Sequence, residues 1–465
     1  MTSPKTLLSI AVLLLALTAC AHYEARPVEL SALAKSQATR TLDTNTVMAM
    51  RSRIAPETRP EVEQDRLWLL AAILSHNPKV ASAKATIATA EVQAKAERHI
   101  ASPTLTLTGE YANDPATKSP WLIGGAVDLP LDMRGRRSAR LRSADLAVLI
   151  ARYDFAEVVW AERMAARRAL IDHFIAERRI ATDLEMLSLR DRQLAAAGRR
   201  LKSGAASNVE LEQVRIAREA AARDLAQAQG QSVQSSVAIA SILGLPANAI
   251  DQNHWIWADF EAAPAPDGVD QGARIAAVTG RADVLKALAD YDRADAAYRG
   301  EIAKQVPALT LSPGYTWERG LVKLPLSVGL SLPPLDLNHH AIVAAKQARE
   351  EAGKKLEVVV AAANGAIDAA LAERDHAWEA LRALREHDLP VAQAAARRAD
   401  DRLRLGGIDR VIWADAQGAL LDARGRELDA LARLHVAEAA LEDALREPLE
   451  GPETGMTVSA LEAMK

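Results

Sequence analysis

Cysteine and aromatic side chains are scarce in this sequence. Its 465 residues include one Cys and three Phe, and aromatic residues make up 4% of the chain. A single cysteine excludes a disulfide within the chain, and so few aromatic rings cannot fill the two or three compact cores that this length would otherwise suggest. Alanine dominates instead, together with Arg, Glu, Asp, Gln and Leu. This composition is typical of long helices that approach one another closely.

An excess of positive charge and the signatures of enzymes are also missing. The formal net charge of -4 and the pI near 6.3 exclude an overall basic, nucleic-acid-binding character. No P-loop, G-x-S-x-G or H-E-x-x-H motif and no paired cysteines occur, so we expect neither enzymatic activity nor a cofactor. His339-His340 is the one adjacent pair of histidines, and we interpret it as part of a solvated turn rather than as a metal site. The sequence therefore predicts no metal ligands.

Proline is absent between Leu131 and Leu245. Such a run, rich in Ala, Arg, Leu and Glu, can hold two very long helices, and residues 202–208 contain its one evident turn. The roughly 65 residues before that turn would span about 100 Å, which is far too long for a globular domain. After the turn, apolar residues step by three and four as in a coiled-coil seam, at Leu211, Val214, Ala217, Ala221 and Leu225.

Two stretches, residues 103–131 and 307–335, alternate apolar and polar side chains. In the first, Leu105 and Leu107 alternate with threonines; in the second, the alternation continues from Leu324 to Leu332. Period-two alternation bounded by Pro and Gly predicts strands with one apolar and one polar face. Each stretch is therefore predicted to form a pair of strands.

The second half of the chain repeats the order of the first: helix, strand pair, long helix, tight turn, helix. We expect the helix after residue 270 to run from about 272 to 304, and the later long helix to run to Leu405 with Pro390 as its only interruption. The predicted division is a segment with little regular structure (20–60), a first repeat (61–246, strand pair 103–131, helical tip 202–208), a linker (247–270), a second repeat (271–447, strand pair 307–335, helical tip 405–409) and a C-terminal tail (448–465).

The N-terminus has the pattern of a processing signal. Lys5 is followed by the apolar run from Leu7 to Leu17 and then by Thr18-Ala19-Cys20. This resembles a bacterial lipoprotein signal, with residues 1–19 removed and Cys20 acylated, rather than an ordinary signal peptide; Ala21 after the cysteine fits sorting to the outer membrane. Several acyl chains on one residue give stable anchoring in membrane lipid. No other stretch is long and apolar enough to predict a transmembrane helix.

Four amphipathic strands are too few to close a barrel in a membrane, where every backbone group must be satisfied. Copies of the chain would have to pool their strands; two copies would supply eight and three would supply twelve, and only the wider barrel leaves room for a channel. The long helices would form a second cylinder beneath it. Aromatic residues expected at strand ends, where a membrane girdle would lie, are Tyr111, Trp121, Tyr315 and Trp317.

The duplicated pattern, Asn77-Pro78 in the first helix, Arg281-Ala282-Asp283 at the start of the second half and the glycines at both helical tips resemble the outer-membrane efflux protein family, the TolC-like outer membrane factors. The resemblance covers residues 60 to 447. It implies a mainly α fold with a small β membrane part: a homotrimer with a twelve-stranded barrel, four strands from each chain, continued by a long α-helical barrel in the periplasm. It also implies an exit duct that docks to a periplasmic adaptor and an inner-membrane pump.

The stretch from Asp128 to Arg140 is similar to the "Gly-Lys-Arg" segment of heavy-metal efflux members of that family. This favours metal cations as cargo over organic compounds, although no His-rich, Met-rich or Cys-rich tract is present. A group of arginines in and after this stretch is expected at the polar boundary beneath the barrel: Arg134, Arg136, Arg137, Arg140 and Arg142.

The resemblance also suggests functional residues near the tips. Glu210 and Asp415 match acidic positions that line the periplasmic aperture in the family, whereas Ile412 stands where the family can have an acid and Ile408 where it can have an arginine. The alternative is that Glu210 and Asp415 are ordinary carboxylates favoured by the helix dipole. The adaptor is expected to dock at the tips, around Gly204, Ala205, Gly406 and Gly407.

A competing class is a lipid-anchored periplasmic coiled-coil adaptor or scaffold without a channel. An adaptor would carry one helical hairpin flanked by small β-domains with many short strands. The sequence predicts two helical hairpins, and strands only in the two amphipathic pairs, which favours the channel.

Overall fold

The computed structural model describes residues 23–56, 64–99, 102–111, 120–131, 135–250, 255–261, 263, 268–318 and 320–455, and it divides into two units, Met1–Thr41 and Leu42–Lys465. The first unit contains helix α2 (Leu30–Ala38), whose residues are all exposed. The expected leader and Cys20 lie outside the described residues. All further elements belong to the second unit.

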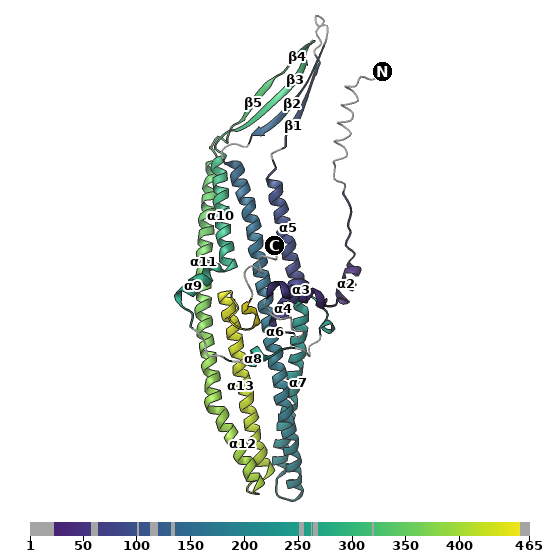
Figure 1. Ribbon diagram of the computed structural model, residues 1–465, viewed down its shortest axis with the longest axis vertical. Helices are drawn as coiled ribbons and strands as arrows, with labels where there is room; N and C mark the ends of the chain where they lie inside the picture. The colour runs from purple at the N-terminus through teal and green to yellow at the C-terminus, as the bar shows by residue number, and fades with distance from the viewer. Residues whose placement is uncertain are drawn as a thin grey trace. The chain divides into compact units, whose positions relative to one another are not determined.

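Helices make up most of the second unit (Figure 1). They are α3 (Thr44–Ile54), α4 (Arg66–His76), α5 (Pro78–Glu97), α6 (Arg136–Lys202), α7 (Asn208–Ile242), α8 (Ala258–Glu261), α9 (Gln271–Gly280), α10 (Ala282–Ala303), α11 (His339–Ala383), α12 (Leu389–Arg404) and α13 (Arg410–Leu445). The 67 residues of α6 confirm the long helix expected from the proline-free run. None of the helices in the described part of the chain combines the length and apolarity needed to cross a membrane.

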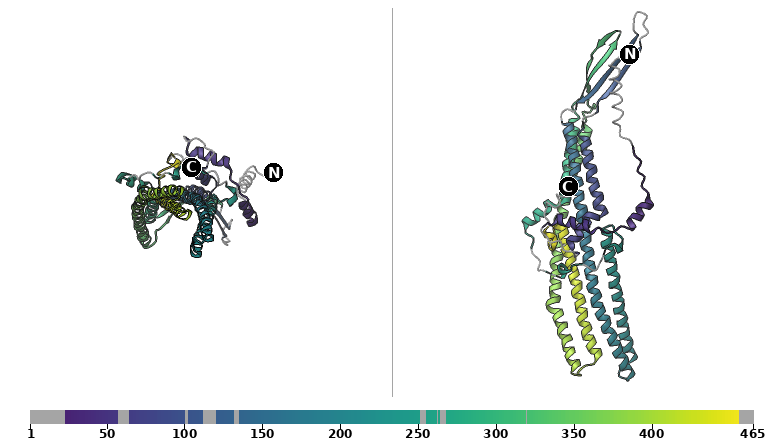
Figure 2. Two further views of the ribbon diagram at one scale, coloured as in Figure 1. Left: turned by 90° about the horizontal axis from the view of Figure 1, so that it is seen from below. Right: turned by 45° about the vertical axis from the view of Figure 1, so that its right-hand side comes forward.

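The long helices of this unit lie side by side in one curved layer (Figure 1; Figure 2). In the half next to the sheet, α5 packs on α6, α6 on α10 and α10 on α11. In the other half the order is α7, α6, α13 and then α11 with α12. The sheet lies at one end of the layer, and the turns that join α6 to α7 and α12 to α13 lie at the other.

Five antiparallel strands form the sheet: β1 (Thr104–Tyr111), β2 (Trp121–Leu131), β3 (Ala308–Glu318), β4 (Leu321–Lys323) and β5 (Leu326–Ser331). β2 lies between β1 and β3, and both β4 and β5 pair with β3. Because directly paired residues share a face, the pairs Leu105–Val127, Leu129–Leu311 and Leu311–Val328 place their side chains on one face across four strands. The predicted apolar face is confirmed.

The opposite face of the sheet is polar. Thr106 Oγ1 donates a hydrogen bond to Asp128 Oδ2 over 3.0 Å, and the hydroxyl of Ser312 bonds to the same carboxylate. Asp128 therefore joins three neighbouring strands. Near the distal end of the first strand pair, Tyr111 and Trp121 make an edge-to-face contact with ring centroids 5.0 Å apart.

Two expected elements are interrupted in the structure. The helix expected from 272 to 304 breaks at Arg281, whose extended backbone (ψ 134) separates α9 from α10 and whose side chain bonds to Asp283. The strand expected from Leu324 to Leu332 begins only at Leu326, as β5, and Leu324 and Pro325 separate it from β4. Pro325 cannot donate to the ladder, although its carbonyl accepts from Gly314 N over 2.8 Å.

Two segments expected to lack regular structure contain helix. Within 20–60, the structure has α2 and α3; α3 forms because Asp43 caps it, accepting from Asn45 N and Thr46 N, and because Val47 and Ile54 pack into the core. His339 and His340 begin α11 rather than forming a turn. The turn precedes them, at Leu337 and Asn338, which have positive φ.

The interruption expected at Pro390 is confirmed in a specific form. A π-helical turn, η2 (Leu384–Asp388), joins α11 to α12 directly before this proline. The wider turn accommodates a residue that has no backbone N–H to donate, so the two helices continue one another.

The main core lies where α4 and the linker segment meet the middle of α6 and the C-terminal half of α13 (Figure 1). α4 is buried along nearly its whole length, and Trp68 packs edge-to-face on Trp255, with ring centroids 6.1 Å apart. Trp255 and Trp257 of the linker segment both belong to this core.

Candidate functional site

The tip between α6 and α7 is a Schellman turn. Gly204 has φ +77, a conformation that favours glycine. Gly204 N donates to the carbonyl of Leu201 over 3.0 Å, and Ala205 N donates to that of Arg200 over 2.8 Å. These two bonds satisfy carbonyls at the end of α6 and reverse the chain within a few residues.

The tip between α12 and α13 has the same construction. Gly406 has φ +73, Gly406 N donates to Leu403 O over 3.1 Å, and Gly407 N donates to Arg402 O over 2.8 Å. A side chain at Gly204 or Gly406 would find open space but a strained backbone, whereas a Cβ at Gly407 would lie 3.5 Å from the Arg402 carbonyl oxygen, an ordinary contact. The two predicted tips therefore share one backbone geometry.

Each returning helix begins with a side-chain cap. Ser207 and Glu210 form a capping box: Glu210 N donates to Ser207 Oγ over 3.2 Å, and Ser207 N donates to Glu210 Oε2 over 2.7 Å. Asp409 caps α13, accepting from Val411 N and Ile412 N, both over 2.9 Å. Glu210 is thus a first-turn carboxylate with an exposed side chain.

Asp415, the second acidic candidate, lies one turn further along its helix and faces α6. Gln193 Nε2 donates to Asp415 Oδ1 over 2.7 Å, and Arg190 Nη1 lies 3.7 Å from the same oxygen. Gln193 is buried, but the Asp415 side chain remains 63% exposed. This carboxylate therefore ties the second helical hairpin to the first while still facing solvent.

The other two candidates, Ile412 and Ile408, lie in the first turn of α13 and in the turn before it. Ile412 is 54% exposed and Ile408 is half-buried. In the described part of the chain, Glu210 makes both of its capping-box hydrogen bonds with Ser207, so the structure does not bring the four candidates into one contact group within a single chain.

A small apolar cluster and one ion pair hold the two hairpins together near their tips. Leu189 of α6 packs on Ala414 and Leu421 of α13. Arg200, just before the first tip, lies with its Nη1 2.8 Å from Oδ2 of Asp409, just after the second. The two hairpins are therefore connected by apolar packing between α6 and α13 and by an ion pair between the two tips.

The arginines after the first strand pair bind the ends of neighbouring helices. Arg136 donates through Nε to the carbonyl of Ala303 and through Nη2 to that of Lys304, both over 3.2 Å. A guanidinium at a helix C-terminus satisfies carbonyls that have no partner in the helix. These arginines lie at the junction of sheet and helices, and their place at the polar boundary beneath a barrel stays a prediction; Arg134 lies outside the described residues.

Asn77 has a role that its sequence motif only partly indicated. Its Oδ1 accepts from Lys79 N and Val80 N, so it caps α5, with Pro78 at the first helical position. Its Nδ2 donates to Glu162 Oε2 over 2.7 Å and to Ile242 O over 2.6 Å. One buried side chain thus joins α5, α6 and the end of α7.

A buried ion cluster lies at the end of α13 and was not foreseen from the sequence. Its members are Arg66, Arg163, Arg167, Glu442, Glu450 and Glu453. Burial raises the pKa of the Glu442 carboxyl above its usual value, although Arg167 and Arg163 oppose this. The partners come from α4, α6 and the segment after α13, so no local sequence pattern could have revealed them.

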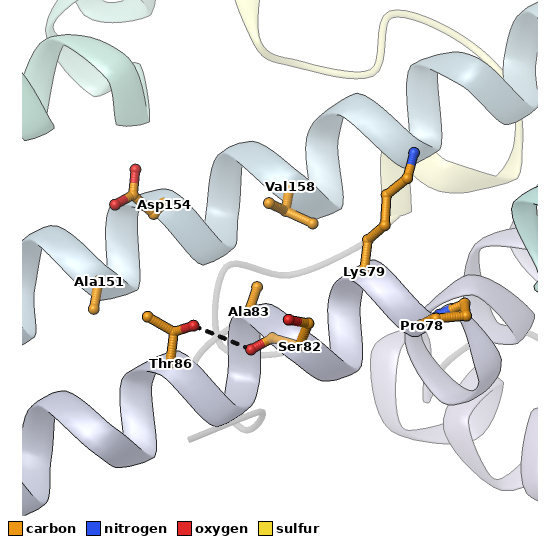
Figure 3. A pocket seen from close by; sticks show the side chains of 8 residues that line it. All are labelled: Pro78, Lys79, Ser82, Ala83, Thr86, Ala151, Asp154 and Val158. Atoms are coloured by element: carbon orange, nitrogen blue, oxygen red, sulfur yellow. Dashed lines mark hydrogen bonds between the residues drawn. The ribbon is translucent and has the colours of Figure 1, made fainter. Parts of the chain in front are cut away.

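Figure 3 shows a groove between α5 and α6 with a volume of about 550 Å³. Its walls carry small or short side chains and two charged ones: Pro78, Lys79, Ser82, Ala83, Thr86, Ala151, Asp154 and Val158. Both charged groups already have partners, because Lys79 Nζ lies 2.6 Å from Glu162 Oε1 and Lys286 Nζ lies 2.6 Å from Asp154 Oδ1. The groove offers a shallow, mostly apolar surface.

Comparison with known proteins explains this architecture. Residues 69–245 and 276–445 match the family described as "Outer membrane efflux protein". The chain belongs to the outer membrane efflux protein family. The two matched segments contain both helical hairpins and both strand pairs, and the family and the shared fold make the chain an outer-membrane efflux channel.

Known proteins that are similar to this chain align with most of its length. The cobalt-zinc-cadmium resistance protein CzcC of Cupriavidus metallidurans is 24% identical over 317 residues, covering 67% of this chain and 74% of that protein. The solved structure of CusC is 19% identical with a TM-score of 0.66, covering 83% of this chain and 92% of the other. The CmeC outer membrane channel of Campylobacter jejuni is 14% identical with a TM-score of 0.68, covering 95% and 98%.

Proposed function

We propose that this efflux channel works as a homotrimer and is the passive exit duct of a tripartite pump. The observation that carries the proposal is the open, two-faced sheet. Leu105 and Leu107 in β1 are 64% and 77% exposed, and Leu330 in β5 is 61% exposed. Both β1 and β5 are edge strands. A sheet with an exposed apolar face and two unpaired edges suits a lipid-facing wall completed by further copies.

The helical layer supports the same assembly. α5 and α7 each pack on α6 and form the border of the layer. Only Val80 and Ala94 are buried in the 20 residues of α5, and its Val92 is 64% exposed. Together with the shallow groove of Figure 3, this leaves a surface of small residues on which a helix of a neighbouring copy can pack closely. Three curved layers would enclose a duct.

Within this assembly, the tips around Gly204, Ala205, Gly406 and Gly407 are the proposed dock of the periplasmic adaptor, because they lie at the end farthest from the sheet (Figure 2). Glu210 and Asp415, with Ile412 and Ile408, are the proposed lining of the periplasmic aperture. A ring of carboxylates at a constriction selects and binds cations.

Acylated Cys20 is the proposed lipid anchor. Cys20→Ala would remove this anchor, and the readout is the loss of palmitate labelling.

Metal cations are the proposed cargo. The relative CzcC is named for cobalt, zinc and cadmium resistance, and the stretch from Asp128 to Arg140 is similar to the "Gly-Lys-Arg" segment of heavy-metal efflux members. A strain that lacks this chain should become sensitive to these metals while its tolerance of organic dyes stays unchanged. The reverse pattern would replace metal cations by organic compounds as the cargo.

The central test is conduction by the purified protein. We expect a single detergent-solubilised species with the mass of three chains, which forms long-lived ion-conducting pores in a planar lipid bilayer. A lipid-anchored adaptor or scaffold would bind membranes without conducting. A trimer that never conducts would therefore favour the scaffold. A monomer that does not insert into the bilayer would overturn the proposed barrel of strands from three chains.

A further inference from the structure

A histidine and two carboxylates meet beside the buried ion cluster. His435 and Glu438 lie three residues apart on one face of α13, and Glu450 approaches from the segment that follows this helix. One potential ligand atom from each residue lies within 4.8 Å of those of the other two. His435 is 1% exposed, Glu438 is 9% exposed and the Glu450 side chain is 22% exposed, so most of this group is shielded from bulk solvent.

The orientation of His435 is fixed by the linker. Its Nε2 lies 2.7 Å from the carbonyl oxygen of Phe260 in α8. A carbonyl can only accept, so Nε2 carries a hydrogen and donates it. In a neutral ring the Nδ1 lone pair then faces Glu438 Oε2, 3.1 Å away. Two acceptors at this distance need a cation or a proton between them. A histidine whose other nitrogen donates to a backbone carbonyl is the usual arrangement of a metal ligand.

Among the described residues, one carboxylate of the site has no arginine partner. Arg66, Arg163 and Arg167 form ion pairs with Glu442, Glu450 and Glu453. Glu438 instead has His435 as its partner. Arg66 and Arg167 both contact Oε1 of Glu450, so Oε2 of that residue is left for another partner. A buried carboxylate needs a compensating charge.

We propose that His435 Nδ1 and one oxygen each of Glu438 and Glu450 bind a divalent transition-metal cation of the zinc type. One imidazole and two carboxylates suit such an ion, which takes nitrogen at about 2.0–2.1 Å and oxygen at about 2.0–2.2 Å. Ligands at these distances around a tetrahedral ion lie about 3.3 Å apart, and the His435–Glu438 pair already has 3.1 Å between its atoms. A rotation of the Glu450 carboxylate completes the set, and water takes the fourth position.

The bound ion would fix the segment after α13 to the helix itself. Glu450 belongs to that segment, and the Phe260 carbonyl that orients His435 belongs to the linker. The site thus joins three parts of the chain that converge in the middle of the helical layer. It is buried and does not depend on which cargo the channel carries, so it is a structural metal site rather than a station for transported ions.

Metal binding is tested with the full chain in detergent, its affinity tag removed and its metal stripped with EDTA. Zn²⁺ is titrated in competition with a chromophoric chelator, and Co²⁺ is titrated by its visible absorption. We expect one ion per chain, with the Co²⁺ spectrum of a four-coordinate site. His435→Gln keeps a donor for the Phe260 carbonyl but removes Nδ1, and it should weaken Zn²⁺ binding at least tenfold. Hydrogen exchange over residues 441–455 should slow when Zn²⁺ binds.

Glu438→Gln is the second variant, in case His435→Gln does not fold, and it should also weaken binding at least tenfold. His376→Gln, at an exposed histidine of α11, is the matched control and should bind as the wild type does. Absence of stoichiometric binding, or equal binding by both site variants and the wild type, would overturn the proposal. Conduction through the trimer is measured separately, so this failure leaves the channel function untouched.

Discussion

Arg200 Nη1 lies 2.8 Å from Asp409 Oδ2, and this ion pair joins the two helical tips. Each partner has a second role at its own tip. Arg200 also donates through Nη2 to the carbonyl of Ala205 over 3.1 Å, and Asp409 caps α13. The contact therefore couples the geometry of one reversal to that of the other.

These two roles of Asp409 can be separated by substitution. Asp409→Asn keeps a capping oxygen and loses the ion pair, whereas Asp409→Ala loses both. Both partners of the pair are more than one-third exposed, so the pair should contribute less than about 1 kcal/mol; loss of the cap should cost about 1 kcal/mol more. Hydrogen exchange in the first turn of α13 should speed up strongly in Asp409→Ala and little in Asp409→Asn. Equal exchange in both variants would mean that the cap contributes nothing.

Docking of the adaptor at the tips predicts that bulk at Ala205 blocks complex formation. Ala205 is exposed and follows the positive-φ glycine, so Ala205→Trp adds volume without straining the backbone. It should abolish binding of the cognate adaptor in a pull-down and abolish efflux, while the trimer still forms and conducts. Ala34→Trp on the exposed helix α2 is the control and should bind normally. Normal efflux by Ala205→Trp would remove the tips as the dock.

The two faces of the sheet predict opposite tolerance of charge. Leu107 and Thr108 are neighbours in β1 on opposite faces. Leu107→Lys places a charge on the apolar face, which costs about 2–4 kcal/mol near the middle of a bilayer, and should reduce the amount of trimer recovered from outer membranes. Thr108→Lys on the polar face should insert normally. If both variants insert equally, the apolar face does not meet lipid.

Much of this arrangement could be predicted because its signals are local. The alternation around Leu105 gives the faces of the sheet, and the lack of proline gives the length of α6. Even the cap role of Glu210 was visible as Ser207-x-x-Glu210, the pattern of a capping box. The break between α9 and α10 at Arg281 could not be predicted from local sequence, because the Arg281 side chain is held by the carbonyl of Ala444, far away in sequence.

The candidate sites divide in the same way. The tips follow from glycines and could be placed from the sequence, whereas the meeting of His435 with Glu450 depends on how the chain returns after α13. Asp415 lies between these cases. Its position was found by resemblance, but its bond to Gln193 depends on the packing of α13 on α6.

Asn77 should be among the most sensitive positions for stability. It is 2% exposed and makes four hydrogen bonds to three helices. Asn77→Ala removes the cap of α5, about 1 kcal/mol, and leaves the Glu162 carboxylate and the Ile242 carbonyl with a lost donor, about 1–3 kcal/mol each. The total loss in unfolding free energy, measured by denaturant titration, should be about 3–7 kcal/mol. Asn77→Ser should recover only the part of this free-energy loss that comes from the missing cap of α5.

Acidification should destabilise the fold through His173. Burial lowers the pKa of this imidazole below its usual 6.5, although the carboxylate of Glu177 opposes the shift. The unfolded chain then takes up the proton first, so stability is full above pH 6.5 and is lost as the pH falls from 6.5 towards the lower folded pKa. The thermal midpoint should drop over this window.

His173→Asn is the matched variant for that measurement. Its amide can keep the hydrogen bond that His173 Nδ1 makes with Ser235 Oγ over 3.0 Å, but it has no proton to gain. The drop in thermal midpoint below pH 6.5 should therefore be smaller in this variant than in the wild type. An identical pH profile would assign the acid sensitivity to other groups.

The proposed aperture can be tested without disturbing the helices that carry it. Glu210→Gln keeps a capping-box residue at the third helical position, and Asp415→Asn keeps an oxygen for Gln193 Nε2. The double variant therefore removes two charges per chain but preserves both sets of hydrogen bonds. Single-channel recordings should show weaker cation selectivity and weaker block by divalent ions, because a ring of carboxylates at a constriction binds cations.

Glu379→Gln on α11, an exposed carboxylate paired with Arg382, is the control for the aperture. It removes the same kind of charge far from the tips and should leave selectivity and block unchanged. If the double variant also keeps wild-type selectivity and block, the carboxylates of Glu210 and Asp415 do not line the constriction. Their role would then be limited to what their bonds provide, the cap of α7 and the link between α13 and α6.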